Sequence, residues 1–227
     1  MVWRPAFDGA ELEQEREIVL EEIAMYEDDP QDKVFDVLGE AVFGGHPLGR
    51  PIIGRAPVIR DTPVDQIAAF HAARYVPGSV VIAAAGSVDH DQIVELAEKT
   101  LRDGIGSAPG IEPAPADPAA TVRFQRKDTE QCHVCLGAIG LPRGDDRRFA
   151  SRVLDAIFGG LSSSRLFQAV REERGLAYSV YSVEHTFSDV PILQLSAGLE
   201  SGKCIEAYHC MRGIVDDLRE NGPRPEE

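Results

Sequence analysis

The chain has 227 residues, of which 43% are hydrophobic and 27% charged, as in an ordinary globular protein. Its formal net charge of −15 disfavours nucleic acid as a partner and is compatible with basic peptides, although a solvated acidic surface explains it more simply. No apolar run is long enough to cross a bilayer, so we expect no membrane span.

A helix is predicted over residues 11–26, which contain neither glycine nor proline. At about 100° per residue, its apolar side chains form one stripe, made of Leu12, Ile18, Val19, Ile23 and Tyr26. Glu15 and Glu22, one heptad apart, fall inside that stripe. A carboxylate removed from water costs several kcal/mol unless it is paired or metal-bound. We therefore expect both acids to have a partner, either a metal ion or an arginine such as Arg16.

The rest of the first half is predicted to hold helices, loops and one strand. The strand follows from a continuous apolar run, which is typical of a buried strand. In chain order, the predictions are a helix over 32–43, a loop over 44–51, a helix that starts at Thr62-Pro63 with the threonine hydroxyl as its cap, the buried strand over 79–86, and a helix from Asp89 or Asp91 to Leu101.

Residues 104–120 contain four prolines and show neither helical nor strand periodicity, so they are predicted to link two domains, 1–103 and 121–227. In the second domain, strands are predicted over 122–126, 131–139, 176–184 and 192–199, and helices over 145–158, 165–174 and 201–221. Runs of helices beside runs of strands predict an α+β fold.

Cys132 and Cys135 have the Cys-x-x-Cys spacing of redox and zinc sites. They lie on a predicted strand, where residues three apart point to opposite faces, so we expect neither a disulfide nor a chelate. Cys204 and Cys210, on the last predicted helix, are expected to be ordinary small apolar residues.

A second group of candidate residues lies in the segment 165–178. Arg171 is predicted near the end of a helix that Gly175 terminates, and Tyr178 enters the strand that follows. A guanidinium and a phenol in this position could bind a peptide carbonyl. The alternative is a surface ion pair beside a half-buried tyrosine.

Four segments, in order along the chain, resemble the pitrilysin/insulinase family of zinc endopeptidases, and most closely its bacterial and mitochondrial processing-peptidase branch. They are EREIVLEEI at 15–23, HPLGRPIIG at 46–54, YVPGSVVIAAAG at 75–86 and SSRLFQAVREERGLAYSVYS at 163–182. The resemblance implies two partial domains of mainly antiparallel sheet flanked by helices. It also implies a peptide substrate that lies extended along a sheet edge.

The resemblance also assigns roles to four residues. Glu22 resembles the distal glutamate that supplies the third zinc ligand, and Glu15 the accessory acidic residue of the catalytic site. Arg171 and Tyr178 resemble the pair that reaches from the second domain toward the substrate carbonyl, where donors stabilise the oxyanion.

The chain departs from the family pattern because its six histidines include no His-x-x-Glu-His motif. We therefore expect a chain truncated at both ends, with an incomplete Zn2+ site and no activity in isolation. The alternative is a non-catalytic partner subunit, which binds peptide for a separate catalytic chain in a homo- or hetero-oligomer. The bacterial branch favours a cytoplasmic location.

Overall fold

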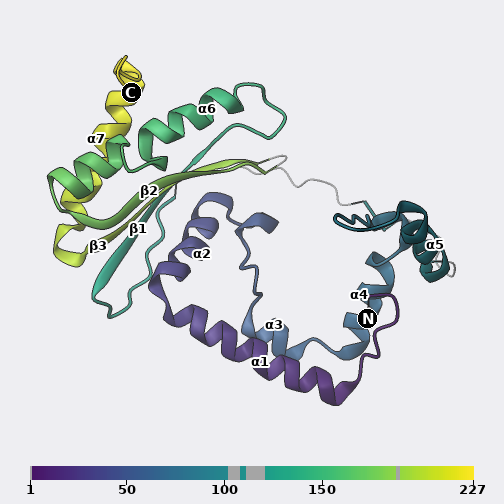
Figure 1. Ribbon diagram of the computed structural model, residues 1–227. Helices are drawn as coiled ribbons and strands as arrows, with labels where there is room; N and C mark the ends of the chain where they lie inside the picture. Colours follow the sequence, from purple (N-terminus) through teal and green to yellow (C-terminus); the bar gives the residue numbers. More distant parts are fainter. Residues whose placement is uncertain (1, 102–107, 111–120, 188–189) are drawn as a thin grey trace. The chain divides into compact units, whose positions relative to one another are not determined.

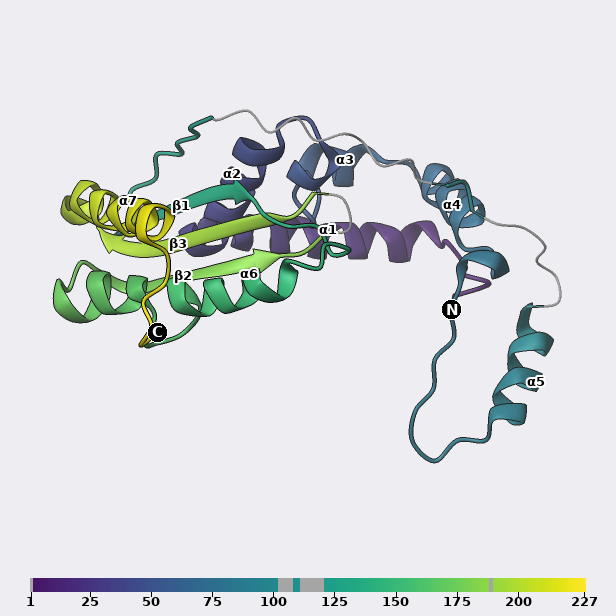
Figure 2. The ribbon, with the colours of Figure 1, turned by 90° about the horizontal axis from the view of Figure 1, so that it is seen from above.

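The computed structural model describes residues 2–101, 108–110, 121–187 and 190–227 (Figures 1 and 2). Its contacts divide the chain into two units: Met1–Ile23 with Ile53–Glu112, and Ala24–Ile52 with Pro113–Glu227. Apart from 108–110, the predicted linker 104–120 lies outside the described residues, and the predicted domain boundaries remain predictions.

The described part of the first unit is built from helices and connecting turns. These helices are the start of α1 (Gly9–Asp28), then α3 (Ala56–Asp61), α4 (Val64–Arg74) and α5 (His90–Leu101). The Asp8 carboxylate caps α1 by accepting from the backbone N–H groups of Ala10 and Glu11, at 2.9 and 3.1 Å. Three of these helices were predicted; the short α3 was not.

Two predictions in the first unit are wrong. Residues 79–86 form no strand: Val80 is extended, but the segment has no ladder partner among the described residues, and Val81 is 92% exposed. The Thr62 hydroxyl does not cap α4, because it donates to the carbonyl of Val58, 2.6 Å away, at the end of α3. Both errors have the same origin. A local sequence pattern does not show which neighbouring segment the backbone or side chain will form its hydrogen bonds with.

The second unit contains one antiparallel sheet of three strands in the order β1-β3-β2. They are β1 (Gln131–Ile139), β2 (Ala177–His185) and β3 (Ile192–Glu200). α2 (Pro30–Phe43) lies on one face, while α6 (Arg148–Asp155) and α7 (Cys204–Asn221) lie on the other (Figure 1). The α+β class is therefore confirmed. The strand predicted over 122–126 does not form, and its Phe124 is 83% exposed.

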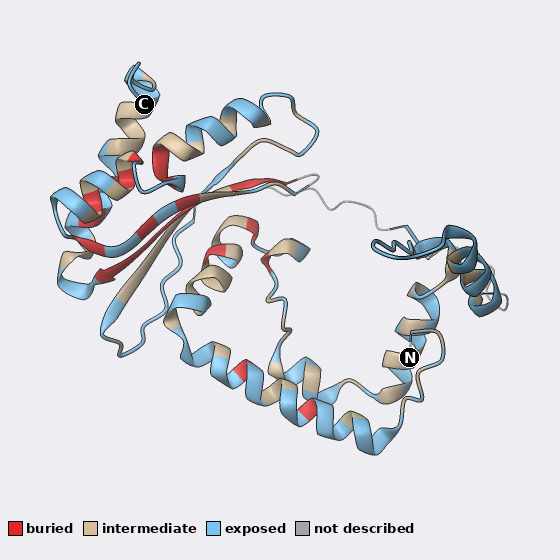
Figure 3. Cartoon of the chain, viewed as in Figure 1, coloured by how far each residue is buried: buried red, intermediate tan, exposed pale blue. Residues whose placement is uncertain are grey.

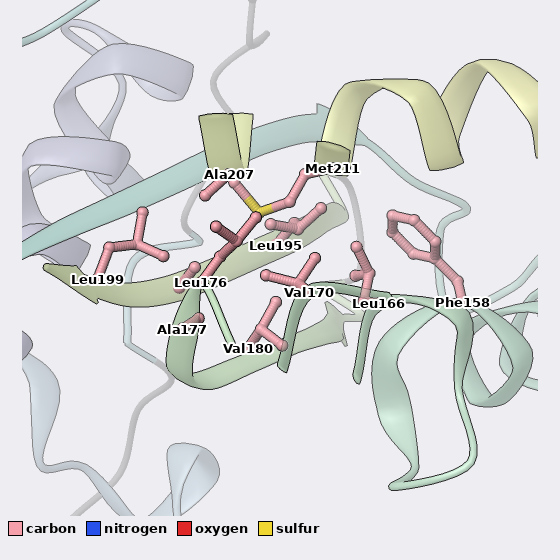
Figure 4. Close-up of a cluster of buried hydrophobic side chains, with 11 residues drawn as sticks. Phe158, Leu166, Val170, Leu176, Ala177, Val180, Leu195, Leu199, Ala207 and Met211 are labelled. Atoms are coloured by element: carbon pink, nitrogen blue, oxygen red, sulfur yellow. The ribbon is translucent and has the colours of Figure 1, made fainter. Parts of the chain in front are cut away.

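Burial concentrates on the sheet, as the red segments of Figure 3 show. The main core lies between the sheet and the helices on the α7 side (Figure 4), and it includes Phe158, Leu166, Val170, Val180, Leu195, Leu199 and Met211. A smaller cluster under α2 joins Leu38 and Phe43 to Ile192. Successive side chains of β3 point alternately into the two clusters, so this central strand connects the helical layers on both faces of the sheet.

Among the helices in the described ranges, none has both the length and the apolar character needed to cross a bilayer.

Candidate functional site

Glu15 and Glu22 are exposed on α1, so the prediction that they lie in a buried stripe is wrong. The buried residues of this helix are Arg16 and Ile23, each of which directly follows one of the two glutamates. Arg16 is only 8% exposed and donates to the carbonyls of Ile59 and Thr62, the latter at 2.9 Å. Those carbonyls lie at the end of α3, where no backbone N–H of the same helix is available to donate to them. The contact with Arg16 therefore fixes which face of α1 is buried.

Neither expected partner of the two acids is present in the described part of the chain. Arg16 pairs with Glu13, at 3.3 Å between Nε and Oε1, rather than with Glu15 or Glu22. Within the described ranges, no three His, Cys, Asp or Glu side chains gather as a metal site. A catalytic zinc needs three protein ligands. The described residues therefore do not fit a zinc ion by themselves, and the assignment of Glu22 as a ligand remains a prediction.

Arg171 lies on a π-helical segment, Phe167–Glu173, that packs against the sheet. Leu166 and Val170 anchor this part of the chain because both are fully buried in the core. The segment ends at Gly175, whose φ of 58° lets its N–H donate to the Arg171 carbonyl at 3.1 Å. This confirms Gly175 as the helix terminator. π-Helical turns are rare and occur frequently at functional sites.

Tyr178 is the extra residue of a β-bulge. Ala177 is paired with Leu199 and Ser179 with the adjacent Gly198, so one residue of β2 has no counterpart on β3. Ala177 and Val180 both face the core, and the bulge leaves the tyrosine between them 78% exposed. A bulge can redirect a side chain in this way, and bulges are frequent beside active sites.

The bulge and the π-helical segment bring Arg171 and Tyr178 together. The guanidinium carbon of Arg171 lies 5.5 Å from the Tyr178 ring centroid and 4.7 Å from that of Phe167. Arg171 also forms an exposed ion pair with Glu172, at 3.7 Å. The alternative interpretation required a half-buried tyrosine, whereas Tyr178 is exposed. A guanidinium and a phenol side by side at the surface can both donate to one carbonyl oxygen.

Phe167 is the residue of this cluster that the sequence analysis missed. It precedes Arg171 by four positions, a spacing at which side chains on a helix are neighbours. The signal was present, but an aromatic residue four positions before an arginine is common in helices that have no such role.

The cysteines lie as predicted, on opposite faces of β1. Cys135 lies on the α2 side, with its sulfur 3.2 Å from the Ser196 hydroxyl oxygen. Cys132 lies on the other side, beside Cys204. Burial and then the neighbouring Cys132 thiol raise the pKa of Cys204 to about 12. A neutral thiol is a weak nucleophile and metal ligand, so this pair gives no sign of a metal site.

Two family models match the chain. The model described as "Peptidase M16 inactive domain" matches residues 62–227, and the model described as "Insulinase (Peptidase family M16)" matches residues 1–56. An uncharacterized zinc protease of Streptomyces coelicolor is 40% identical over 96% of this chain and 49% of its own length. The uncharacterized zinc protease YmxG of Bacillus subtilis is 36% identical over 98% of this chain and 54% of its own length. The chain spans about half the length of the curated relatives it matches.

Solved structures agree with these matches. The crystal structure of a peptidase M16 inactive domain from Pseudomonas fluorescens is 25% identical, with a TM-score of 0.90 over 99% of this chain and 55% of that one. A protease from Helicobacter pylori has the same fold, with a TM-score of 0.82 at 18% identity, over 96% of this chain and 55% of that one.

Proposed function

Because the chain belongs to the M16 insulinase family of peptidases, we propose that it is part of a zinc-dependent metalloendopeptidase, a hydrolase of peptide bonds. In this proposal the chain supplies part of the zinc site and the substrate-contacting pair. The relatives' names as zinc proteases support the reaction class. The 227 residues alone are expected to be inactive.

The observation that carries this proposal is the pairing of the half-buried Arg171 with the exposed Tyr178. A bulge and a π-helical segment are both uncommon, and here each brings one of the two side chains to the same place. Neither side chain is needed there for the core, since Ala177 and Val170 fill it. The proposed role of the pair is to donate hydrogen bonds to the substrate carbonyl oxygen, where negative charge develops.

Glu22 is proposed to supply one zinc ligand and Glu15 to act as the accessory acid. Their exposure is compatible with these roles, because an exposed carboxylate is free to complete a site with ligands from outside the described residues. A single carboxylate does not retain zinc against water. We therefore expect the isolated chain, dialysed and analysed for metal, to hold only substoichiometric zinc.

A hybrid protein tests the proposal. In it, the chain replaces the matching half of the Streptomyces coelicolor relative, so that the hybrid also carries the half that the chain does not span. The hybrid should bind one zinc ion and cleave an unfolded fluorogenic peptide, with the activity lost on chelation. Glu22→Gln should abolish zinc retention. Glu21→Gln is the matched control, since the neighbouring Glu21 on α1 is exposed as well. A Glu22→Gln hybrid that keeps its zinc would show that the ligand assignment is wrong.

The second candidate function is a non-catalytic partner subunit, and the match to a model described as an inactive domain favours it. Such a subunit would bind peptide for a separate catalytic chain of the same family, as part of a homo- or hetero-oligomer. If the hybrid neither binds zinc nor cleaves peptide, this candidate is preferred. The preference for basic peptides and the cytoplasmic location remain predictions.

A further inference from the structure

Two cysteines that stand far apart in the sequence lie next to each other in the structure. Cys132 of β1 is directly opposite Leu199 of β3. β3 ends one residue later, at Glu200, and Cys204 begins α7 after the 3-10 turn Ser201–Lys203. The Cys204 sulfur lies 3.8 Å from the Glu200 carbonyl oxygen. Both cysteines are therefore beside the end of β3.

The two thiols lie on the same face of the sheet and are in contact. Alternate residues of a strand point the same way, so Cys132 shares its face of β1 with Val134 and Leu136. These two side chains pack against the core on the α7 side, and so does Cys204. There the Cys132 and Cys204 thiols are in hydrogen-bonding contact. Two neighbouring sulfur atoms are the starting arrangement for an S–S bond.

The other two cysteines are placed differently. Cys135 points to the α2 side of the sheet, with its sulfur 3.2 Å from the Ser196 hydroxyl oxygen. Cys210 lies more than one helical turn beyond Cys204 on α7. In the part of the chain that the structure describes, Cys132 and Cys204 are the one pair of thiols in contact. Cys135 and Cys210 therefore serve as internal controls.

We propose that Cys132 and Cys204 are a modification site, at which a peroxide oxidises them to a disulfide that ties the start of α7 to the sheet. Disulfides form readily where thiols of a folded chain already lie together, and peroxides are the oxidants that act on a thiolate. Both cysteines are half-buried rather than enclosed, so a small peroxide can reach them.

The reaction has two steps, with Cys132 as the attacking group. Burial and then the Cys132 thiol raise the pKa of Cys204 to about 12, so Cys204 is a neutral thiol at neutral pH. The Cys132 thiolate attacks one oxygen of hydrogen peroxide, the O–O bond breaks, and a sulfenic acid and one water form once the thiol proton is taken up. The Cys204 sulfur then attacks the Cys132 sulfur, the S–O bond breaks, and the oxygen leaves with the Cys204 proton as a second water. Two thiols are oxidised and one peroxide is reduced.

The disulfide would lie in the cross-strand row that ends at the β-bulge. Leu199 pairs with Cys132 on one side and with Ala177 on the other, and Ala177 directly precedes the bulged Tyr178. α7 also contacts the π-helical segment Phe167–Glu173. Oxidation would thus hold in place the helix that packs on this segment. The pair is the same in a peptidase and in a partner subunit, so its oxidation can be tested independently of the proposed function.

The test treats the reduced 227-residue chain, in dilute solution, with a small excess of hydrogen peroxide and digests it without reduction. Mass spectrometry should find the peptides of Cys132 and Cys204 linked, with Cys135 and Cys210 still reduced. The urea midpoint of the oxidised chain should rise by about 1 M, because a disulfide restricts the unfolded chain, and dithiothreitol should reverse the rise. Cys132→Ser should abolish both the link and the rise. Cys135→Ser, on the same strand, is the matched control and should keep both.

Three results of the digest would overturn the proposal. They are a treated chain in which Cys132 and Cys204 both stay reduced, a Cys132 that proceeds to sulfinic acid without any link, and a disulfide that joins two copies of the chain or involves Cys135 or Cys210. A Cys132–Cys204 link that leaves the urea midpoint unchanged confirms the modification site and shows that the bond does not hold α7 on the sheet.

Discussion

Gly159 lies directly against β2: a β-carbon on it would stand 2.6 Å from both the backbone nitrogen and the hydroxyl oxygen of Ser182. The Ser182 hydroxyl in turn donates to the Asp155 carboxylate at the end of α6. The close approach therefore fixes the π-helical turn Ala156–Gly160 on the sheet, next to the start of the segment that carries Arg171.

We expect Gly159→Ala to destabilise the second unit, because backbone as well as side-chain atoms would have to move. Overpacking of this kind costs about 1–3 kcal/mol. Urea unfolding measures the loss. Gly213→Ala, in open space on α7, should be neutral or slightly stabilising because alanine favours helix. Equal unfolding midpoints for Gly159→Ala and the unsubstituted chain would contradict the close contact.

Arg16→Met should loosen the contact between α1 and α3. The substitution keeps the apolar stem but leaves the carbonyls of Ile59 and Thr62 without their donor, which costs about 1–3 kcal/mol. Amide hydrogen exchange in α3 should become faster. Glu13→Gln removes only an exposed ion partner of the same arginine and should change exchange little. Unaltered exchange in Arg16→Met would show that the buried guanidinium does not hold α3.

In the hybrid protein, Arg171→Ala and Tyr178→Phe should lower kcat while zinc stays bound. Removal of one donor to a developing oxyanion typically costs on the order of 10²-fold. Metal analysis and peptide hydrolysis, measured on the same preparation, separate the two properties. The control is Arg174→Ala, an exposed arginine on the turn that follows. Full activity without Arg171 and Tyr178 would remove them from the catalytic site.

Phe167→Leu should lower the activity of the hybrid by a smaller factor, about two- to fivefold, because a cation–π contact that is still reached by water is worth about 0.5–1 kcal/mol. Phe167→Tyr keeps an aromatic face and should retain activity. In the isolated chain, the Nε–H resonance of Arg171 should move when the ring is removed, which gives a readout independent of catalysis. A resonance that stays in place in Phe167→Leu would contradict the stacking.

The pairing of Arg165 with Glu227 predicts a loss of stability in acid. The guanidinium contacts both carboxylate oxygens, at 2.8 and 2.7 Å. It lowers the pKa of Glu227 from 4.5 to about 2. Because the folded-state pKa is lowered, the stabilisation is present above pH 4.5 and disappears as the pH falls through about 2. Urea unfolding of the unsubstituted chain and of Glu227→Gln should differ at pH 6 and converge near pH 2.

The elements of the second unit were predicted from the sequence more accurately than those of the first. β1 begins and ends where its pattern predicted, because it pairs along its whole length with β3. The apolar run at 79–86 had the composition of a strand, but a strand also needs a partner, and the described residues supply none. Composition specifies what a segment prefers, whereas the hydrogen-bond partner decides whether a strand forms.

The candidate site was predicted in part. The helix, its glycine terminator and the strand placed Arg171 near Tyr178, but only the register of β2 on β3 reveals the bulge that exposes the tyrosine. The rotation of α1 could not be predicted, because it depends on where the Arg16 guanidinium finds carbonyl acceptors on an unpredicted helix. A search for periodic apolar residues counts every arginine as polar, so it cannot identify an arginine that is buried.

The surplus residue in β2 separates the demands of folding from those of the substrate contact proposed for Tyr178. Ala177 and Val180 each keep their place in the core whatever side chain stands at position 178. Substitutions there can change what the surface selects without any repacking beneath it. The strand thus provides a position at which ligand preference can diverge among homologues while the sheet stays the same.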